Sequence, residues 1–138
     1  MDQGPDYLLV YGTLRASFTN EAARFLHQRS RYIGEVSFPG SLFNLGTYPG
    51  AIYQPDSPNR VVGTVYAIGH HKSVVLAFLD EYEGIGPGYA LPHEYIRVIV
   101  PVDFQSTRID CWVYLYNHST EDKRVIIGGD YTAYTTIR

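Results

Sequence analysis

The sequence has little cysteine, few charged residues and no long hydrophobic run. One cysteine among 138 residues excludes an internal disulfide and is typical of a protein in the reducing cytoplasm. No apolar run is long enough to cross a bilayer, and the first five residues (Met-Asp-Gln-Gly-Pro) do not have the character of a signal peptide. We therefore expect a cytoplasmic protein with no membrane partner.

The charge balance argues against nucleic acid as a partner. The formal net charge is −3 and no basic run is present, whereas nucleic-acid binding needs clustered positive charge. Charged residues make up 18% of the chain and hydrophobic residues 45%, which is typical of a globular protein. The length suits one domain with its own core, so we expect residues 1–138 to form a single domain.

The composition favours β-structure. Thirteen tyrosines suit strands and partly hydrated cavities, and thirteen glycines with eight prolines indicate many turns. Hydrophobic periodicity predicts helices at residues 20–29 and 74–83, with a turn at Pro39-Gly40. It predicts strands at residues 7–11, 31–38, 41–45, 50–54, 61–68, 94–102 and 109–116, and a weak strand at 123–127.

These elements predict an α+β fold: a small mixed β-barrel of about six or seven strands with two flanking helices. Closing the sheet removes exposed strand edges in a chain of this size. The apolar strand faces would fill the barrel interior, and one mouth would hold the site.

The first candidate site is the turn after the first strand. Residues 7–11 are apolar and β-prone, Gly12 and Thr13 break the strand, and a helix follows. Such a turn leaves several backbone N–H groups pointing one way, where they can bind a carboxylate or a polarised carbonyl oxygen. A plain strand-to-helix connection is the alternative interpretation.

The second candidate is Glu83, in the last turn of the helix at 74–83. The helix dipole and the nearby Asp80 and Glu81 all disfavour its negative charge, so we expect a raised pKa. At about 100° per residue, Asp80 falls roughly 150° from the apolar stripe, in solvent, and Glu83 roughly 90° away, at the stripe's border. Glu83 can therefore face a cavity, although an exposed glutamate at a helix end is the alternative.

Other reactive residue types lack supporting patterns. Cys111 lies in a strand next to Trp112, which predicts a buried, inert thiol. His70 and His71 precede a helix, but no third ligand has zinc-site spacing, so we expect no metal. The other histidines (His27, His93 and His118) are predicted to lie at the surface.

Four short motifs occur in order and together span most of the chain. They are Tyr-Gly-Thr-Leu-Arg at 11–15, Gly-Thr-Val-Tyr at 63–66, Leu-Asp-Glu-Tyr-Glu-Gly at 79–84 and Tyr-Ile-Arg at 95–97. In this order the sequence resembles the γ-glutamylcyclotransferase-like family, which includes γ-glutamylamine cyclotransferases and AIG2-like proteins. The resemblance implies a small barrel with a cavity at one end.

The resemblance also implies a reaction. The α-amine of a γ-glutamyl compound attacks its own γ-carbonyl and forms 5-oxoproline, so no metal or cofactor is needed. One carboxylate moves the proton, and backbone amides stabilise the oxyanion. Arg97 would pair with the substrate carboxylate or with Glu83, whose pKa it would then lower. The candidate site is the acid/base Glu83 with the binding residues Tyr11, Gly12, Thr13, Leu14, Tyr95, Arg97 and Tyr89.

Several alternatives stay open at this stage. The loop between Glu83 and Tyr95 is longer than expected and carries Tyr89, so both tyrosines are candidates for lining the pocket. A non-catalytic protein that binds a small ligand on the same barrel is the competing function, and a cavity plugged by Tyr89 or Tyr116 would favour it. Transfer of the γ-glutamyl group between amines would use the same residues. The leaving amine cannot be identified from the sequence.

Overall fold

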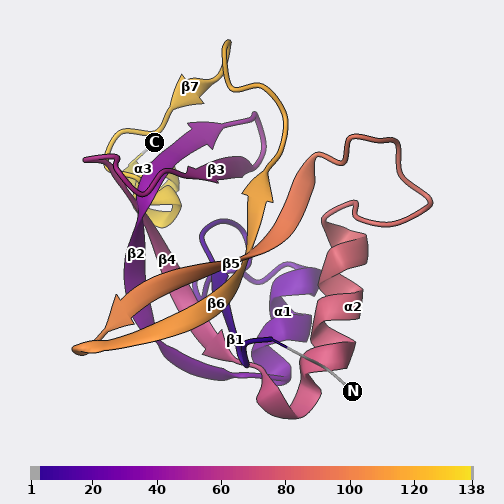
Figure 1. The fold of residues 1–138 in the computed structure, drawn as a ribbon. Helices are drawn as coiled ribbons and strands as arrows, with labels where there is room; N and C mark the ends of the chain where they lie inside the picture. Colours follow the sequence, from indigo (N-terminus) through magenta and orange to yellow (C-terminus); the bar gives the residue numbers. More distant parts are fainter. Residues whose placement is uncertain (1–3, 138) are drawn as a thin grey trace.

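The computed structural model describes residues 4–137, which form seven strands, three α-helices and one 3₁₀ turn (Figure 1). The strands are β1 (Tyr7–Val10), β2 (Arg31–Asn44), β3 (Pro49–Tyr53), β4 (Arg60–Ala67), β5 (Tyr95–Phe104), β6 (Thr107–Tyr116) and β7 (Arg124–Val125). The helical elements are α1 (Glu21–Gln28), η1 (Gly69–His71), α2 (Lys72–Tyr82) and α3 (Tyr131–Ile137).

The strands form one curled, nearly closed sheet. Its order is β3-β2-β4-β1-β6-β5, and β7 adds to β2 outside this path. Strand β1 pairs in parallel with β6, and the other pairings of the described chain are antiparallel. Because β2 also packs on β5 and β3 on β6, the sheet curls into the small mixed barrel that the sequence predicted (Figure 1).

The topology brings four strand ends together. Strands β1 and β6 run in the same direction, so both end at the same edge of the barrel. Strand β5 is antiparallel to β6, and β3 lies three antiparallel pairings away from β1, so both begin at that edge. Residues next to these four ends, which are far apart in sequence, can therefore form one site.

Strand β2 is longer than predicted, because the chain does not turn at Pro39 and Gly40. The strand pairs with β4 over residues 31–39 and then with β3 over residues 40–44. A Cβ atom at Gly40 would lie 2.0 Å from the Ile52 carbonyl oxygen. The predicted turn is wrong, and the glycine instead allows close backbone approach where the strand changes partner.

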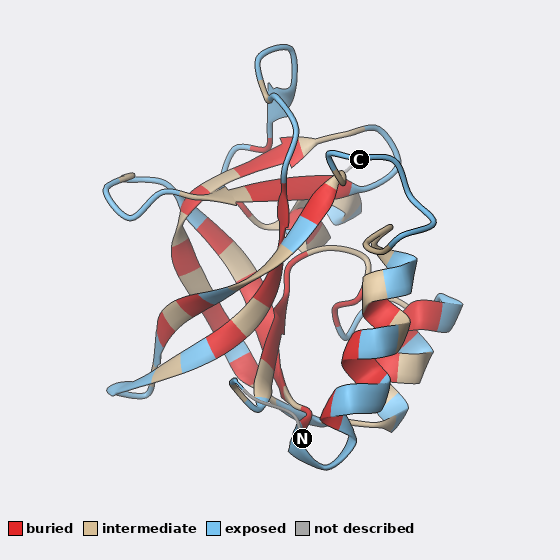
Figure 2. Cartoon of the chain, turned by 45° about the vertical axis from the view of Figure 1, so that its right-hand side comes forward, coloured by how far each residue is buried: buried red, intermediate tan, exposed pale blue. Residues whose placement is uncertain are grey.

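Helices α1 and α2 lie side by side and cover one face of the sheet (Figure 1). The Asn20 side chain caps α1 by accepting a hydrogen bond from the Ala23 N–H at 2.9 Å, as the sequence indicated. In α2 the buried residues include Val75, Leu76 and Leu79, whereas Tyr82 at the end of the helix is 49% exposed. Figure 2 shows buried and exposed residues on different sides of the two helices.

Helix α3 was not predicted, since the tail is rich in tyrosine and threonine and has no clear helical stripe. The Asp130 carboxylate starts it by accepting from the Ala133 N–H at 3.1 Å, and Tyr131 packs into the barrel core. The expected pair of flanking helices is therefore correct for α1 and α2 but incomplete. No helix in the described part of the chain is long and apolar enough to cross a membrane.

The sheet has one apolar core on its barrel side and a second on the side that faces the helices. Alternate residues of β6 face opposite sides: Val113 and Leu115 pack inside the barrel, and Tyr114 and Tyr116 pack toward the helices. Cys111 is fully buried in the barrel, and burial raises the pKa of its thiol to about 12, which agrees with the predicted inert role.

We expect Gly40→Ala to destabilise the protein, because the new methyl group would collide with the Ile52 carbonyl at the point where β2 changes partner. The free energy of unfolding, measured by urea denaturation, should fall by about 3 kcal/mol. Gly88→Ala is the control, because a Cβ atom there meets no heavy atom within 4 Å. Equal stability of the two variants would contradict this account of the bend.

Candidate active site

A cavity of about 550 Å³ opens where the four strand ends meet the C-terminal end of α2. Its lining includes residues at or beside the ends of β1, β3, β5 and β6 and at the end of α2. Arg97 is absent from the described residues that line the cavity, and the other predicted site residues all line it. These are Tyr11, Gly12, Thr13, Leu14, Glu83, Tyr89 and Tyr95.

The loop at residues 11–15 is held by its carbonyl groups. The Gly12 carbonyl accepts from the Arg15 N–H at 3.2 Å, the Thr13 carbonyl from Asn20 Nδ2 at 2.7 Å and the Leu14 carbonyl from His27 Nε2 at 2.8 Å. Residues 12–14 lie outside the helices and strands. Among the described residues, no acceptor takes a hydrogen bond from their N–H groups. The clamped loop thus leaves donors for a ligand.

Two residues, the N-cap of α1 and one residue within the helix, therefore support the loop, a role that the sequence did not indicate. Asn20 caps the helix with its Oδ1 atom and binds Thr13 with its Nδ2 atom. His27 is partly buried and stacks on Tyr66 with ring centroids 5.2 Å apart, so its predicted place at the surface is wrong. Only the folded arrangement of α1 against the loop reveals this support.

Gly12 and Tyr11 lock the start of the loop against β3. A Cβ atom at Gly12 would lie 2.8 Å from Pro49 Cγ, so a larger residue would push the loop away. The Tyr11 hydroxyl donates to the Tyr114 carbonyl at 2.6 Å and accepts from the Ala51 N–H at 3.1 Å. Burial raises the pKa of Tyr11, and its ring serves as a fixed wall of the cavity.

Tyr95 and Tyr89 both line the cavity, but in different ways. Tyr95 is buried and its hydroxyl donates to the Pro49 carbonyl at 2.7 Å. Tyr89 is 41% exposed and its hydroxyl donates to Glu81 Oε1 at 2.9 Å. Tyr95 thus forms part of the inner wall, and Tyr89 belongs to the outer rim on the long loop.

Glu83 caps the end of α2 and reaches the cavity. Its N–H donates to the Leu79 carbonyl at 2.8 Å, and its side chain is partly buried. Burial, which is the largest cause, together with the negative charges of Glu94 and Asp80 raises the pKa of this carboxyl to about 8. The predicted direction is correct, but burial is the largest cause, and the predicted contribution of Glu81 is not among the causes.

Asp80 and Arg97 lie elsewhere than predicted. The Asp80 carboxylate accepts from Arg97 Nε at 2.8 Å and from the Tyr114 hydroxyl at 2.6 Å, so it is partly buried and not in open solvent. Arg97 also stacks over Trp112 at 4.4 Å. Its guanidinium is therefore occupied by Asp80, and the alternative pairing with Glu83 does not occur.

Several residues of the cavity wall were not predicted from the sequence, and three polar ones among them are Tyr48, Glu94 and His118. Glu94 immediately precedes β5, and its Oε2 accepts from the Tyr48 hydroxyl at 2.7 Å. Tyr48 directly precedes β3, and His118 follows β6. Only their positions beside strand ends could have indicated that they belong to the site. The sequence alone does not show that these strand ends meet at one edge of the barrel.

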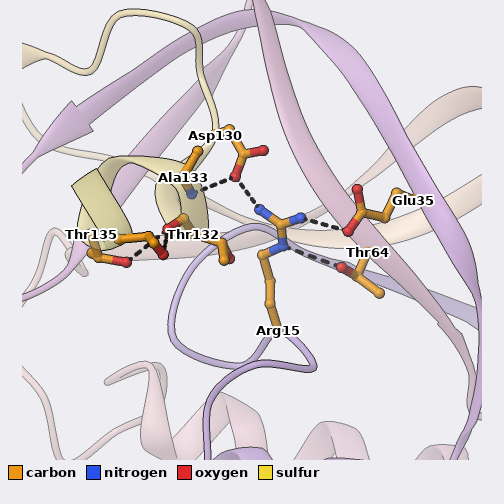
Figure 3. Close-up of polar contacts among 8 residues, drawn as sticks. Arg15, Glu35, Thr64, Asp130, Thr132, Ala133 and Thr135 are labelled. Carbon is orange, nitrogen blue, oxygen red and sulfur yellow. Dashed lines mark hydrogen bonds and ion pairs between the residues drawn. The ribbon is translucent and has the colours of Figure 1, made fainter.

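Arg15, the last residue of the first motif, does not line the cavity, and its side chain ties the loop to the barrel (Figure 3). Its side chain is 4% exposed and donates to Glu35 at 3.1 Å, Asp130 at 2.7 Å and Thr64 at 3.2 Å. These partners come from β2, β4 and the start of α3. One buried guanidinium therefore links three elements to the loop, which is the planar geometry that arginine provides.

The described residues hold no cluster of three or more histidine, cysteine, aspartate or glutamate side chains that could bind a metal ion. His70 and His71 both lie exposed in η1.

Comparison with known families gives a match over residues 8–133 to the family described as "Gamma-glutamyl cyclotransferase, AIG2-like". The chain belongs to this family. The match covers nearly all of the described residues, including the cavity and its loop. Membership agrees with the resemblance that the four motifs indicated.

Solved structures with the same fold include both bacterial and mammalian proteins. YkqA from Bacillus subtilis matches 97% of this chain with a TM-score of 0.72 and 24% identity, and this chain spans 42% of YkqA. YtfP from Escherichia coli matches 94% with a TM-score of 0.65 and 25% identity, over 98% of its own length. An AIG2-like protein from Mus musculus matches 94% with a TM-score of 0.67 and 21% identity, over 89% of its length. Among curated proteins, none matches significantly.

We expect Arg15→Met to lower the free energy of unfolding by about 2 kcal/mol, because it removes a buried, fully bonded guanidinium. Arg108→Met is a matched control: its ion pair with Asp103 spans 3.7 Å between side chains that are 70% and 78% exposed, so its loss should cost less than about 0.5 kcal/mol. Urea denaturation measures both values. A loss in Arg15→Met no larger than in Arg108→Met would contradict the anchoring role.

Proposed function

We propose that this protein is a γ-glutamyl cyclotransferase that releases 5-oxoproline from a γ-glutamyl amine, with Glu83 as the acid/base. The observation that supports this most strongly is the cavity itself. It combines one carboxyl group, whose pKa is raised to about 8, with a clamped loop that offers N–H donors. Family membership supports the reaction class.

The reaction needs little beyond these two features. The substrate's α-ammonium first loses one proton to solvent. As the free amine then attacks the γ-carbonyl carbon, the Glu83 carboxylate accepts the second proton, which the new ring nitrogen must lose. Attack forms the ring C–N bond and a tetrahedral oxyanion, which the N–H groups of residues 12–14 stabilise. Glu83 then returns the proton to the departing nitrogen as the original amide C–N bond breaks. The proton balance is therefore closed within one cycle.

A raised pKa suits this double role. A carboxylate with an ordinary pKa near 4.5 would be a weak base toward an ammonium group and a poor source of a proton near neutrality. A group with a pKa of about 8 can do both. The aromatic walls from Tyr11 and Tyr95 hold the glutamyl chain close to Glu83, which favours ring closure by proximity.

A cavity plugged by Tyr89 or Tyr116 would favour the competing binding-protein interpretation. Tyr89 lies in the wall without filling the space, and Tyr116 is not among the described residues that line it. The open cavity therefore supports the enzyme over a non-catalytic barrel. Transfer of the glutamyl group to a second amine uses the same atoms and is distinguished by its product.

The direct test measures 5-oxoproline release from a panel of γ-glutamyl amines and γ-glutamyl amino acids. Glu83→Gln keeps the shape of the side chain and removes proton transfer, so kcat should fall by about 10²-fold or more. Glu121→Gln removes an exposed glutamate far along the chain and should leave kcat unchanged. The wild-type kcat/KM should rise as pH increases through about 8, since the free enzyme needs Glu83 deprotonated.

An active Glu83→Gln variant would contradict the role of Glu83. Wild-type protein that releases no 5-oxoproline from any substrate, yet binds γ-glutamyl compounds, would instead favour the binding protein. If the glutamyl group appears on an added amine and not as 5-oxoproline, the reaction is intermolecular transfer.

A further inference from the structure

The charged groups on the cavity wall are carboxylates, and one histidine also lines the cavity. Glu83 and Glu94 line the cavity, and no lysine or arginine does so among the described residues. Arg97, which the sequence placed at the site, is paired with Asp80. His118 Nε2 donates to the Pro92 carbonyl oxygen at 3.0 Å. The wall thus offers anionic groups without a cationic partner.

Glu94 is held in place with one oxygen to spare. Its backbone carbonyl accepts from the Asn117 N–H at 2.7 Å, and its Oε2 accepts from Tyr48. The ion pairs of the described residues do not include Glu94, and none of their hydrogen bonds uses its Oε1. A positioned carboxylate in a cavity is therefore available to a ligand.

The aromatic rings around Glu94 suit a cation as well. Tyr48 and Tyr95 lie with ring centroids 6.3 Å apart and both line the cavity, and Tyr82 and Tyr89 lie at its rim. Aromatic faces attract ammonium groups. A carboxylate beside such faces matches an ammonium group better than it matches a neutral or anionic one.

The two ends of a γ-glutamyl compound have opposite needs in this cavity. The glutamyl end, which develops the oxyanion and also carries a carboxylate, requires hydrogen-bond donors, which the N–H groups of residues 12–14 supply and which Glu94 cannot supply. The leaving amine therefore takes the remaining space beside Glu94. A carboxylate on that amine, as in an α-amino acid, would be repelled by Glu94 and would find no lysine or arginine on the described wall.

We propose that Glu94 makes this site selective for γ-glutamyl amines whose leaving amine carries a second, unreacted ammonium group, as a diamine or polyamine does. This inference rests on the proposed cyclotransferase function and names its substrate class. Tyr48 acts as the positioning residue that orients the Glu94 carboxylate.

The test compares three substrates that differ only beyond the reacting amide: mono-γ-glutamyl 1,4-diaminobutane, γ-glutamyl pentylamine and γ-glutamyl 5-aminopentanoate. Their leaving groups carry a cation, no charge and an anion. For the wild type we expect kcat/KM for 5-oxoproline release to be about tenfold higher for the cationic than for the neutral substrate, and lowest for the anionic one. Added salt should reduce this preference.

Glu94→Gln should remove the preference, mainly through a higher KM for the cationic substrate, while the neutral substrate changes little. Because Glu94 also raises the pKa of Glu83, the ratio of kcat/KM between substrates is the quantity compared, since each substrate uses the same Glu83. Glu94→Asp keeps the charge and should keep much of the preference. Glu121→Gln, which alters an exposed charge elsewhere, should match the wild type.

Equal turnover of the three substrates by the wild type, or an unchanged preference in Glu94→Gln, would overturn this inference and leave the cyclotransferase function intact. Release of no 5-oxoproline from any of the three would overturn the proposed function and the inference with it. If Glu94→Gln does not fold, the salt dependence of the wild-type preference and the Glu94→Asp variant decide the question.

Discussion

The pKa of Glu83 depends on its burial and on how the charged side chains near the end of α2 are paired. Asp80, one turn earlier, binds Arg97 through two hydrogen bonds and also accepts from Tyr114. Because this pairing occupies the guanidinium, Glu83 is left in a partly buried place with only negative charges affecting it, and its pKa rises to about 8. Burial is the largest cause of this shift, and no cation is among its causes. The proposed acid/base role of Glu83 therefore depends on a carboxyl that is buried without a cationic partner.

The raised pKa of Glu83 lowers the stability of the folded protein at neutral pH. The folded protein keeps the Glu83 proton up to a pH of about 8, whereas the unfolded chain releases it near 4.5. Between these values the folded state binds more protons, so this residue makes the free energy of unfolding fall as pH rises. The cavity therefore needs support from its surroundings. The clamped loop, the buried Arg15 and the β3 contacts of Tyr11 give it that support.

Local patterns predicted most of the elements and missed features that depend on tertiary contacts. The barrel, α1, α2 and the opposed faces of β6 follow from alternation and helical spacing. The continuous β2 does not, since Pro39-Gly40 has the composition of a turn and only the neighbouring Ile52 carbonyl explains its glycine. For the site, short motifs located Glu83 and the loop at 11–14. Glu94 and Tyr48 belong to no motif, and the partner of Arg97 was decided by packing across three elements.

The most direct test of the central claim is a pH titration of the Glu83 side-chain carboxyl carbon by NMR in the ligand-free protein. The Glu83→Gln variant assigns the signal, because that variant lacks it. The account predicts a midpoint near pH 8, well above the ordinary 4.5. A midpoint near 4.5 would mean that the carboxylate is solvated or paired with a cation, and the proposed double role of Glu83 as base and acid would then be wrong.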